Sequence, residues 1–359
     1  MRAVAVTPGV SGSLRPIETP EPNPAAHEAV VRVTQVGICG TDMAIVGGMH
    51  CQSPSGSDFL IIGHESLGQV VDPGGAAGSL SPGDYVVATV RRPCIHGRCR
   101  PCRSGHTDMC LTGDFTERGI AGRHGYMAEY YAEDPRFLVK VPAQLAPVGA
   151  LLEPLSVPEK GLRQVWKIQE RLPWAPRKAV VLGAGPIGLL AAMLLRLRGI
   201  DTWVFDIASP GSAKASIASQ TGAAFVNTAD VPVSAIAQAL GPVDVIVEAT
   251  GYSPLAVEAI QQLGNNGVLC LLGMAAGANA VPIDSGAFNN ALVTGNRLVV
   301  GSVNANLADF QAGVDDLSEF EKEWPGVAAS MLNRRVPLTE YQTAFQRSPE
   351  DIKVTVLLD

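Results

Sequence analysis

Residues 178–199 read KAVVLGAGPIGLLAAMLLRLRG, a short apolar run followed at once by three closely spaced glycines and a longer apolar segment. The run predicts a buried strand, and the segment that starts at Pro186 predicts a helix. A glycine-rich turn between a strand and a helix lets the backbone approach a pyrophosphate and presents helix N-terminal amides to it. The dinucleotide site that this stretch predicts consists of Gly183, Gly185, Pro186, Ile187 and Gly188.

Asp206 ends the next apolar run, TWVFD. An acidic side chain at this interval hydrogen-bonds the adenosine ribose hydroxyls and repels the 2′-phosphate of NADP. The residues that follow, ASPGSAK, offer only Lys214 as a cation. The sequence therefore favours NAD and leaves NADP possible. A flavin or another nucleotide on the same fold, or a glycine turn that only caps a helix, stays open as an alternative.

The residue pattern of the sequence changes between Glu153 and Pro176. Before this segment, short β-branched runs separated by Gly, Pro and Asp indicate a compact β-rich domain. After it, strand-like and helix-like segments alternate, which is typical of a doubly wound parallel sheet and an α/β fold. The strands expected there are 178–185, 201–206, 223–227, 243–251, 267–273 and 297–302. Beyond them we expect a helix over 307–317 and a final strand over 351–359.

Four cysteines, Cys94, Cys99, Cys102 and Cys110, share one segment with C-x4-C-x2-C-x7-C spacing. Four thiolates at such spacing hold a tetrahedral zinc with no open position, which is a structural site. The alternative is two disulfides in a surface loop. The opening residues MRAVAVTPGVSGSLRP contain no continuous apolar signal region, so we expect a reducing cytoplasmic location, which favours zinc.

Cys39 in GICGTD, His64 in GHE and Glu153 are further zinc-compatible side chains. Each alone has a structural explanation, as a small buried hydrophobe, a hydrogen-bonded turn histidine and a helix N-terminal carboxylate. Together with a nicotinamide domain they favour an open zinc site. Such a zinc holds a substrate alkoxide while hydride passes to the nicotinamide ring.

The composition excludes two classes of partner. The formal net charge is −7 and no basic stripe is present, which argues against nucleic acid. The longest apolar stretch, 188–195, is interrupted by Arg196 and Arg198 before it reaches the length of a membrane span. We therefore expect a small-molecule substrate and neither a nucleic-acid nor a membrane partner.

Five segments in this order, GICGTD, GHES, the four-cysteine segment, EPLSVPEKG and GAGPIG, resemble the zinc-dependent medium-chain alcohol and polyol dehydrogenases. The resemblance covers essentially the whole chain, and ERGIAGRHGYMAEYY, ALLEPLSVPEKG and GSVNANLADF look most like the glucose 1-dehydrogenase branch, which oxidises aldoses at C1 to lactones. It implies a GroES-like β-rich catalytic domain over 1–155 with a zinc lobe over about 91–112, a Rossmann domain over 156–303, and a C-terminal return over 304–359. It also implies one catalytic and one structural zinc per chain.

Carried over residue by residue, the resemblance implies that Cys39, His64 and Glu153 bind the catalytic zinc, with Glu65 as a supporting or alternating ligand. Thr41 matches the hydroxyl that begins proton removal from the alcohol, and Asp42 matches the carboxylate that orients the imidazole of His64.

Substrate and cofactor contacts are implied in the same way. Thr41, Glu117, Glu153 and Asn304 match sugar-binding positions, and Thr250 and Asn304 match positions near the cofactor. The chain departs from the wider family in the four-residue first gap of the cysteine segment and in Cys51, to which no role is assigned.

Other readings stay open. The same metal and hydride chemistry suits a polyol, threonine or secondary-alcohol substrate, and a non-catalytic nucleotide-binding relative is the alternative from a different class. The resemblance also implies a homotetramer or homodimer assembled through the Rossmann domains.

Overall fold

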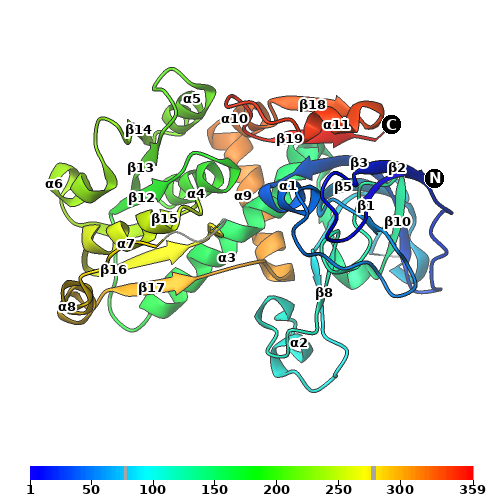
Figure 1. Cartoon of the computed structure of the whole chain (residues 1–359), viewed down its shortest axis with the longest axis horizontal. Helices are drawn as coiled ribbons and strands as arrows, with labels where there is room; N and C mark the ends of the chain where they lie inside the picture. The colour runs from blue at the N-terminus through cyan, green and yellow to red at the C-terminus, as the bar shows by residue number, and fades with distance from the viewer. Residues whose placement is uncertain (77–78, 276–279, 359) are drawn as a thin grey trace. The chain divides into compact units, whose positions relative to one another are not determined.

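The computed structural model describes residues 1–76, 79–275 and 280–358, which form two compact units (Figure 1). The first unit comprises Met1–Ser156, Asn304–Ser318 and the C-terminal segment from Leu332. The second comprises Val157–Val303 and Glu319–Met331. Part of the expected C-terminal return, residues 319–331, therefore packs with the second unit.

A parallel sheet in the order β14-β13-β12-β15-β16-β17 forms the centre of the second unit among the described residues (Figure 1). The strands are β12 (Lys178–Leu182), β13 (Asp201–Asp206), β14 (Ala224–Asn227), β15 (Val243–Glu248), β16 (Leu263–Leu271) and β17 (Leu298–Gly301). The two central strands, β12 and β15, are buried along almost their whole length, as expected for parallel strands covered on both faces. All six runs expected to form strands contain one. The structure ends β12 and β15 three residues before the expected ends at residues 185 and 251, and it begins β16 four residues before the expected start at residue 267.

Helices connect these strands. They are α4 (Pro186–Leu197), α5 (Ala213–Gln220), α6 (Ile236–Leu240), α7 (Ser253–Gln262) and α8 (Ser285–Gly295), and α10 (Val327–Met331) packs against α5. Pro186 starts α4, where its missing amide hydrogen costs nothing. Gly183, at the end of β12, has a φ of +100°, and a Cβ there would lie 2.8 Å from Thr250 Cγ2, so only glycine fits this turn.

Two longer helices, α3 (Leu152–Gln169) and α9 (Leu307–Glu323), run through the points where the chain passes from one unit to the other. The helix predicted over 307–317 extends six residues further, to Glu323. The buried side chains of Leu317 and Phe320 continue its apolar face by three residues, which explains the extension.

The main sheet of the first unit has the order β11-β6-β5-β3-β19-β18, and β10 also pairs with β3. Its strands are β3 (Ala29–Ile38), β5 (Glu65–Asp72), β6 (Tyr85–Ala88), β10 (Tyr130–Glu133), β11 (Leu138–Val141), β18 (Arg334–Pro337) and β19 (Val354–Leu357), and a smaller sheet contains β2 (Arg15–Glu18), β1 (Arg2–Val6) and β4 (Leu60–Ile61). The C-terminal strand β19 lies antiparallel beside β3, so the end of the chain completes the N-terminal sheet (Figure 1). The last residue of the expected strand 351–359 lies outside the described residues.

Short helices complete the described chain. They are α1 (Gly40–Val46), α11 (Tyr341–Ala344) and the 3-10 segments η1 (Gly74–Ala76), η3 (Pro135–Phe137), η4 (Ala143–Leu151), η5 (Val233–Ala235) and η6 (Leu338–Glu340). The four-cysteine segment contains α2 (Arg100–Arg103) and η2 (Thr107–Met109) and projects from the strands of the first unit as a lobe (Figure 1). A third small sheet of β7 (Arg91–Arg92), β8 (Thr116–Arg118) and β9 (Gly122–Arg123) forms its base.

A buried ion-pair network lies under this base. Glu133 in β10 is 1% exposed and pairs with Arg92 of β7 and, at 2.8 Å, with Arg118 of β8. A buried carboxylate with two guanidinium partners avoids the cost of an unpaired charge. The network therefore ties β7 and β8 to the main sheet.

Candidate functional site

The four cysteines of the lobe come together. Their sulfur atoms all lie within 4.8 Å of one another, and Cys99 Sγ lies 4.0 Å from Cys110 Sγ. This separation is about twice the length of a disulfide bond, and all four cysteines are free thiols, so the alternative of two disulfides is not what the structure shows.

The donor set of the lobe fits a structural zinc. Burial works to raise the pKa of the Cys110 thiol, but hydrogen bonds from Thr112 and Gly113 outweigh it and lower the pKa to about 6. Burial and the neighbouring thiols raise the pKa of Cys102 to about 12. Four sulfur atoms this close together form the donor set of a closed tetrahedral zinc site, since zinc binds all four as thiolates.

A second cluster lies where α1 begins. Cys39 is the N-cap of α1: its sulfur accepts a hydrogen bond from the Thr41 amide at 3.2 Å, and its own amide donates to Asp42 Oδ2 at 2.9 Å. His64 directly precedes β5, and its Nε2 lies 3.1 Å from Cys39 Sγ. The helix cap thus points the thiol at the imidazole.

Asp42 fixes the orientation of this histidine. Its side chain is fully buried, and Oδ1 lies 3.3 Å from His64 Nδ1, so Nε2 is the ring nitrogen presented beside the thiol. Burial alone would lower the pKa of His64, but the charges of Cys39 and Asp42 outweigh it and raise the pKa well above 6.5. Burial would likewise raise the pKa of Asp42, but His64 and the Cys39 amide lower it. A metal ligand held through its second nitrogen by a carboxylate is a common arrangement at zinc sites.

Glu65 belongs to the same cluster, because its carboxylate, Cys39 Sγ and a His64 nitrogen all lie within 4.8 Å of one another. It also forms an ion pair with Lys353 of the C-terminal segment, and both side chains are 2% exposed. A Cβ at residue 37 would overlap Glu65 Oε2, so Gly37 makes room for the pair. Sequence reasoning missed Lys353, although a lysine directly before the apolar run of β19 was a signal for a buried ion pair.

Among the described residues, Glu153 is not part of the cluster of Cys39, His64 and Glu65. The charges of His64 and Glu65 nevertheless act on its carboxyl group. It lies near the start of α3 and is 9% exposed. The pKa of Glu153 is raised to about 7, mainly by burial. The charge of Glu65 raises it further, and the charge of His64 partly opposes the rise. A thiol, an imidazole and one or two carboxylates are a suitable donor set for a zinc that keeps an open position.

Glu117 and Asn304 lie together. Asn304 Nδ2 donates to Glu117 Oε1 at 2.8 Å, although the two residues are 187 positions apart. Asn304 has a φ of +61°, in the left-handed region that asparagine tolerates better than most residues. Arg91 donates to the same carboxylate oxygen at 2.9 Å, a contact that sequence reasoning missed.

The glycine-rich turn of the second unit is joined to Asp206. Asp206 Oδ2 accepts a hydrogen bond from the Ala184 amide at 2.6 Å, and Oδ1 accepts one from the Ala208 amide at 2.8 Å. The carboxylate therefore stands at the carboxyl end of β13 beside the turn that precedes α4. This end of a parallel sheet is where nucleotides bind in doubly wound folds.

Thr250 is exposed in the loop after β15, next to Gly183. The buried Glu248 holds this loop, since its Oε1 accepts hydrogen bonds from the Thr250 amide at 2.7 Å, from the Gly251 amide at 3.1 Å and from the Thr250 hydroxyl. The turn and the loop thus lie side by side at one edge of the sheet.

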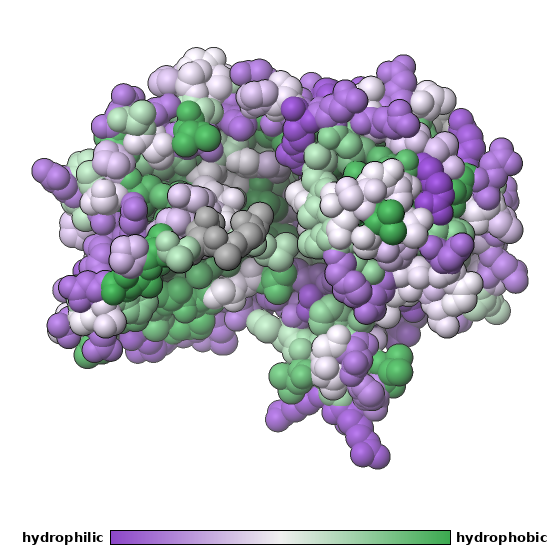
Figure 2. Space-filling model, in the orientation of Figure 1, coloured by the Kyte–Doolittle hydropathy of each residue, from purple (hydrophilic) through white to green (hydrophobic). Residues whose placement is uncertain are grey.

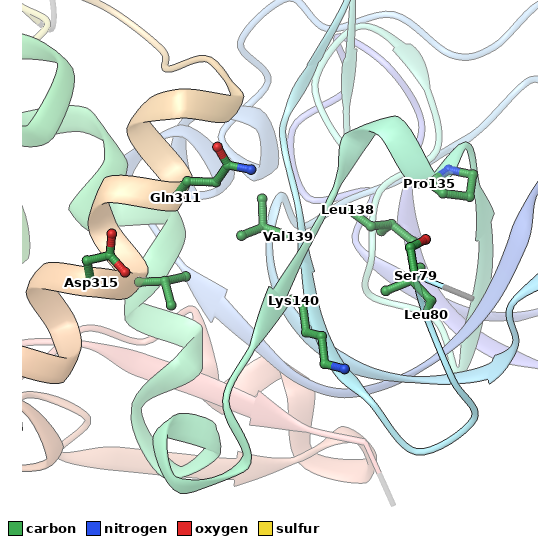
Figure 3. A pocket seen from close by; sticks show the side chains of 9 residues that line it. Ser79, Leu80, Pro135, Leu138, Val139, Lys140, Gln311 and Asp315 are labelled. Atoms are coloured by element: carbon green, nitrogen blue, oxygen red, sulfur yellow. The ribbon is translucent and has the colours of Figure 1, made fainter. Parts of the chain in front are cut away.

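The first unit also contains a groove of about 600 Å³ that is separate from these residues (Figure 3). It is lined by Ser79, Leu80, Pro135, Leu138, Val139, Lys140, Gln311, Val314 and Asp315. Lys140 forms an ion pair with Asp84 at 2.7 Å. None of the predicted site residues lines it.

Among the described residues, no helix combines the length and the apolar character needed to cross a lipid bilayer.

Two family models match the chain. The alcohol dehydrogenase GroES-like domain matches residues 25–143, and the glucose dehydrogenase C-terminus matches residues 146–358.

Curated relatives match over nearly their whole length. The chain is 46% identical to a glucose 1-dehydrogenase of Methanocella arvoryzae over 356 residues, 99% of each protein. It is 40% identical to a glucose 1-dehydrogenase of Thermoproteus tenax over 357 residues, again 99% of each. Among solved structures, the glucose dehydrogenase of Haloferax mediterranei in complex with NADP, Zn and gluconolactone is 34% identical, with a TM-score of 0.92 over 100% of this chain and 99% of the other.

Proposed function

The chain belongs to the zinc-dependent medium-chain dehydrogenases, in their glucose 1-dehydrogenase branch, and we propose that it oxidises an aldose at C1 to the lactone with NAD in preference to NADP. It is a zinc-dependent oxidoreductase that acts on a sugar CH–OH group and uses a nicotinamide cofactor.

The observation that carries the proposal is the contact between Cys39 Sγ and His64 Nε2, supported from the far side of the ring by Asp42. We propose that Cys39, His64 and a carboxylate from Glu65 or Glu153 hold the catalytic zinc. When bound, such a zinc acts as a Lewis acid that favours the ionised form of the substrate hydroxyl. Asp42 keeps His64 in the tautomer whose Nε2 lone pair faces the metal site.

The Thr41 amide contacts the Cys39 thiol, and we assign to the Thr41 hydroxyl the first step of proton removal from the sugar O1. The hydroxyl passes this proton on toward the cofactor hydroxyls and solvent. Loss of this proton from O1 and of hydride from C1 leaves a C=O bond, which in a cyclic aldose is a lactone. The cofactor supplies the hydride acceptor and leaves reduced. Glu117 and Asn304, already joined by a hydrogen bond, are assigned to the remaining sugar hydroxyls.

For the cofactor, we propose that Asp206 binds the adenosine ribose hydroxyls and disfavours a 2′-phosphate. Both carboxylate oxygens of Asp206 already accept hydrogen bonds from backbone amides, those of Ala184 and Ala208. These bonds orient the side chain and keep its charge at the end of β13. The Haloferax mediterranei relative was solved with NADP, so the preference of this chain rests on Asp206 and on the scarcity of cations after it.

Domain boundaries follow the same proposal. We assign 1–155 and 304–359 to the GroES-like catalytic domain and 156–303 to the Rossmann domain, with residues 319–331 packing on the latter.

The decisive experiment measures NADH or NADPH formation by zinc-loaded protein with D-glucose, D-galactose, D-xylose, sorbitol, L-threonine and simple alcohols. Aldose-dependent reduction of NAD with the highest kcat/KM supports the proposal. Activity confined to a linear polyol, to threonine or to an alcohol would remove the sugar assignment. If none of these substrates supports cofactor reduction, the result would favour a non-catalytic relative.

The cofactor preference is tested by Asp206→Asn, which removes the negative charge and keeps the shape of the side chain. We expect the ratio of kcat/KM for NAD over NADP to fall about tenfold or more, since one charge near a phosphate contributes on the order of 1 kcal/mol or more. Asp201→Asn, at the exposed start of the same strand, is the control and leaves the ratio unchanged. An unchanged ratio in Asp206→Asn would contradict the ribose assignment.

A further inference from the structure

Arg91 occupies a buried position between the cysteine lobe and Glu117. Its side chain is 8% exposed, Nε donates to Glu117 Oε1 at 2.9 Å, and Nη1 donates to the carbonyl oxygen of Asp108 in the lobe at 3.1 Å. The guanidinium carbon lies 3.7 Å from the centre of the Phe115 ring. Two hydrogen bonds and one ring contact hold the group in a single orientation.

Glu117 Oε1 is shared. It accepts from Arg91 on one side and from Asn304 Nδ2, at 2.8 Å, on the other. Within the described residues, Glu117 Oε2 carries no hydrogen bond and is the oxygen left to accept one from a ligand. Asn304 Oδ1 is bonded to the Ala305 amide, so the Asn304 amide group is fixed as well.

The neighbouring arginine provides a contrast within the same two-residue strand. Arg92 points to Glu133, which it shares with Arg118, and the Arg92 and Glu133 side chains are 3% and 2% exposed. That network is closed and purely structural. The Glu117 side chain is 13% exposed, and one of its oxygens is unused by the described residues.

We propose that Arg91 is a positioning residue for the sugar substrate, which sets the carboxylate of Glu117 and, through it, the amide of Asn304. The inference rests on the proposed function and deepens it, because it makes sugar affinity depend on a side chain that does not itself touch the sugar. Only a forked guanidinium can reach Glu117 and the Asp108 carbonyl together, whereas a single ammonium reaches one of them.

The lobe takes part in this support. The segment that carries Asp108 lies between two of the four cysteines, Cys102 and Cys110, and its His106 Nδ1 lies 3.3 Å from Asn306 Nδ2. Asn306 in turn caps the start of α9 through the amides of Ala308 and Asp309. The lobe therefore contacts the surroundings of Glu117 and Asn304 at two points. The Asp108 carbonyl holds Arg91, and His106 lies beside Asn306.

The test compares Arg91→Lys with Arg92→Lys, the same substitution at adjacent positions of β7. For Arg91→Lys we expect the KM for the aldose to rise about tenfold, which is about 1.4 kcal/mol of binding, with kcat and the KM for NAD changed less than about twofold. Arg92→Lys lowers the melting temperature and leaves the aldose KM unchanged. Equal aldose KM values in wild type and Arg91→Lys, or an equal rise in Arg92→Lys, would overturn the proposal.

A double-mutant cycle separates positioning from general damage. In a Glu117→Gln background, Arg91→Lys has a much smaller effect on the aldose KM than in wild type, because both changes remove the same contact. Full additivity of the two changes would refute action through Glu117. Binding of gluconolactone, followed by calorimetry without cofactor, gives a second readout that does not depend on turnover and is expected to weaken in Arg91→Lys.

The two hypotheses fail in different ways. If wild type does not oxidise any aldose and does not bind gluconolactone, the proposed function is wrong. If wild type does both and Arg91→Lys does so equally well, the function stands and the role of Arg91 is wrong.

Discussion

Asp42 links local folding to the candidate zinc site. One carboxylate oxygen accepts the amide of Cys39 and completes the N-terminal cap of α1, while the other faces His64 Nδ1. The cap and the histidine are therefore oriented by the same buried side chain. Because Cys39 is itself the N-cap residue, the thiol is positioned by the helix that it starts.

The first residue-scale prediction concerns Cys39→Ser. Serine is a good N-cap, so its hydroxyl can keep the contact with the Thr41 amide, but it is a poor zinc ligand. We expect bound zinc, measured by atomic emission, to fall from about two to about one per chain, turnover to be lost, and the melting temperature to change little.

Cys102→Ser is the matched control. It also removes one zinc, but from the lobe, so we expect a clear fall in melting temperature. Full activity in Cys39→Ser, or a large loss of stability in it, would contradict the assignment of the two metal sites.

A second residue-scale prediction concerns the buried Glu133. Burial would raise the pKa of Glu133, but Arg118 and Arg92 outweigh it and hold that pKa below 4.5. The ionised carboxylate therefore stabilises the fold at pH values above the unfolded-state pKa, and this contribution is lost as the pH falls through the lower, folded-state pKa.

Glu133→Gln should thus lower the melting temperature most at neutral pH, by a loss on the order of 3 kcal/mol, and the gap to wild type should narrow as the pH falls below about 4.5. Calorimetric melting between pH 3 and 7 measures this gap. Glu129→Gln, which removes the partner of the half-exposed Arg2, is the control with a much smaller effect. A gap for Glu133→Gln that is constant with pH would refute the argument.

At the scale of elements, the strands were predictable because their apolar runs are short, rich in valine and bounded by turn residues. The end of the helix predicted over 307–317 was not predictable, since its last turn is mostly charged and only Phe320 marks the buried face.

Cys39, His64 and Glu65 come together as the motifs indicate, while their roles stay predictions. The pairs Lys353–Glu65 and Arg91–Glu117 join distant segments, and no local pattern specifies which buried charge meets which.

The edge strand β17 leads to a prediction about assembly. It pairs only with β16 among the described residues, and apolar side chains on and near it are exposed, including Val299 at 39%, Val293 at 66% and Ile283 at 50%. Figure 2 shows hydrophobic residues gathered over this part of the second unit. An unpaired, apolar edge is a template for pairing with a second copy of the chain.

We therefore expect a homodimer or homotetramer built on β17, with a mass by light scattering of at least twice the 37.5 kDa of one chain. Val299→Lys, which places a charge on the edge, should shift the protein toward monomer. Val10→Lys, at a similarly exposed valine in the first unit, should leave the mass unchanged. A monomeric wild type, or an unaltered mass in Val299→Lys, would argue against this interface.

At the scale of the whole molecule, each unit contains an apolar cluster and candidate site residues of its own. The apolar core of the first unit is built from its own strands, such as β3 and β5, and that of the second from β12, β15 and β16. Cys39 and His64, which we propose as zinc ligands, lie in the first unit, whereas the glycine-rich turn and Asp206 lie in the second. We therefore expect cofactor binding and metal binding to be separable properties of one chain.

This separation leads to the last prediction, on removal of the metal. A chelator that takes the zinc assigned to Cys39 and His64 should abolish turnover, because no side chain of the cluster can replace a Lewis acid. NADH binding, followed by its fluorescence, should persist, because the residues assigned to the nucleotide lie in the other unit. We expect its dissociation constant to change less than about threefold, which corresponds to less than about 1 kcal/mol. Zinc added back should restore activity, and Asp206→Asn should show the converse pattern, with the metal retained and NADH binding weakened. Loss of NADH binding on chelation would mean that the metal supports the nucleotide site, and the two units would then have to be treated as one cooperative whole.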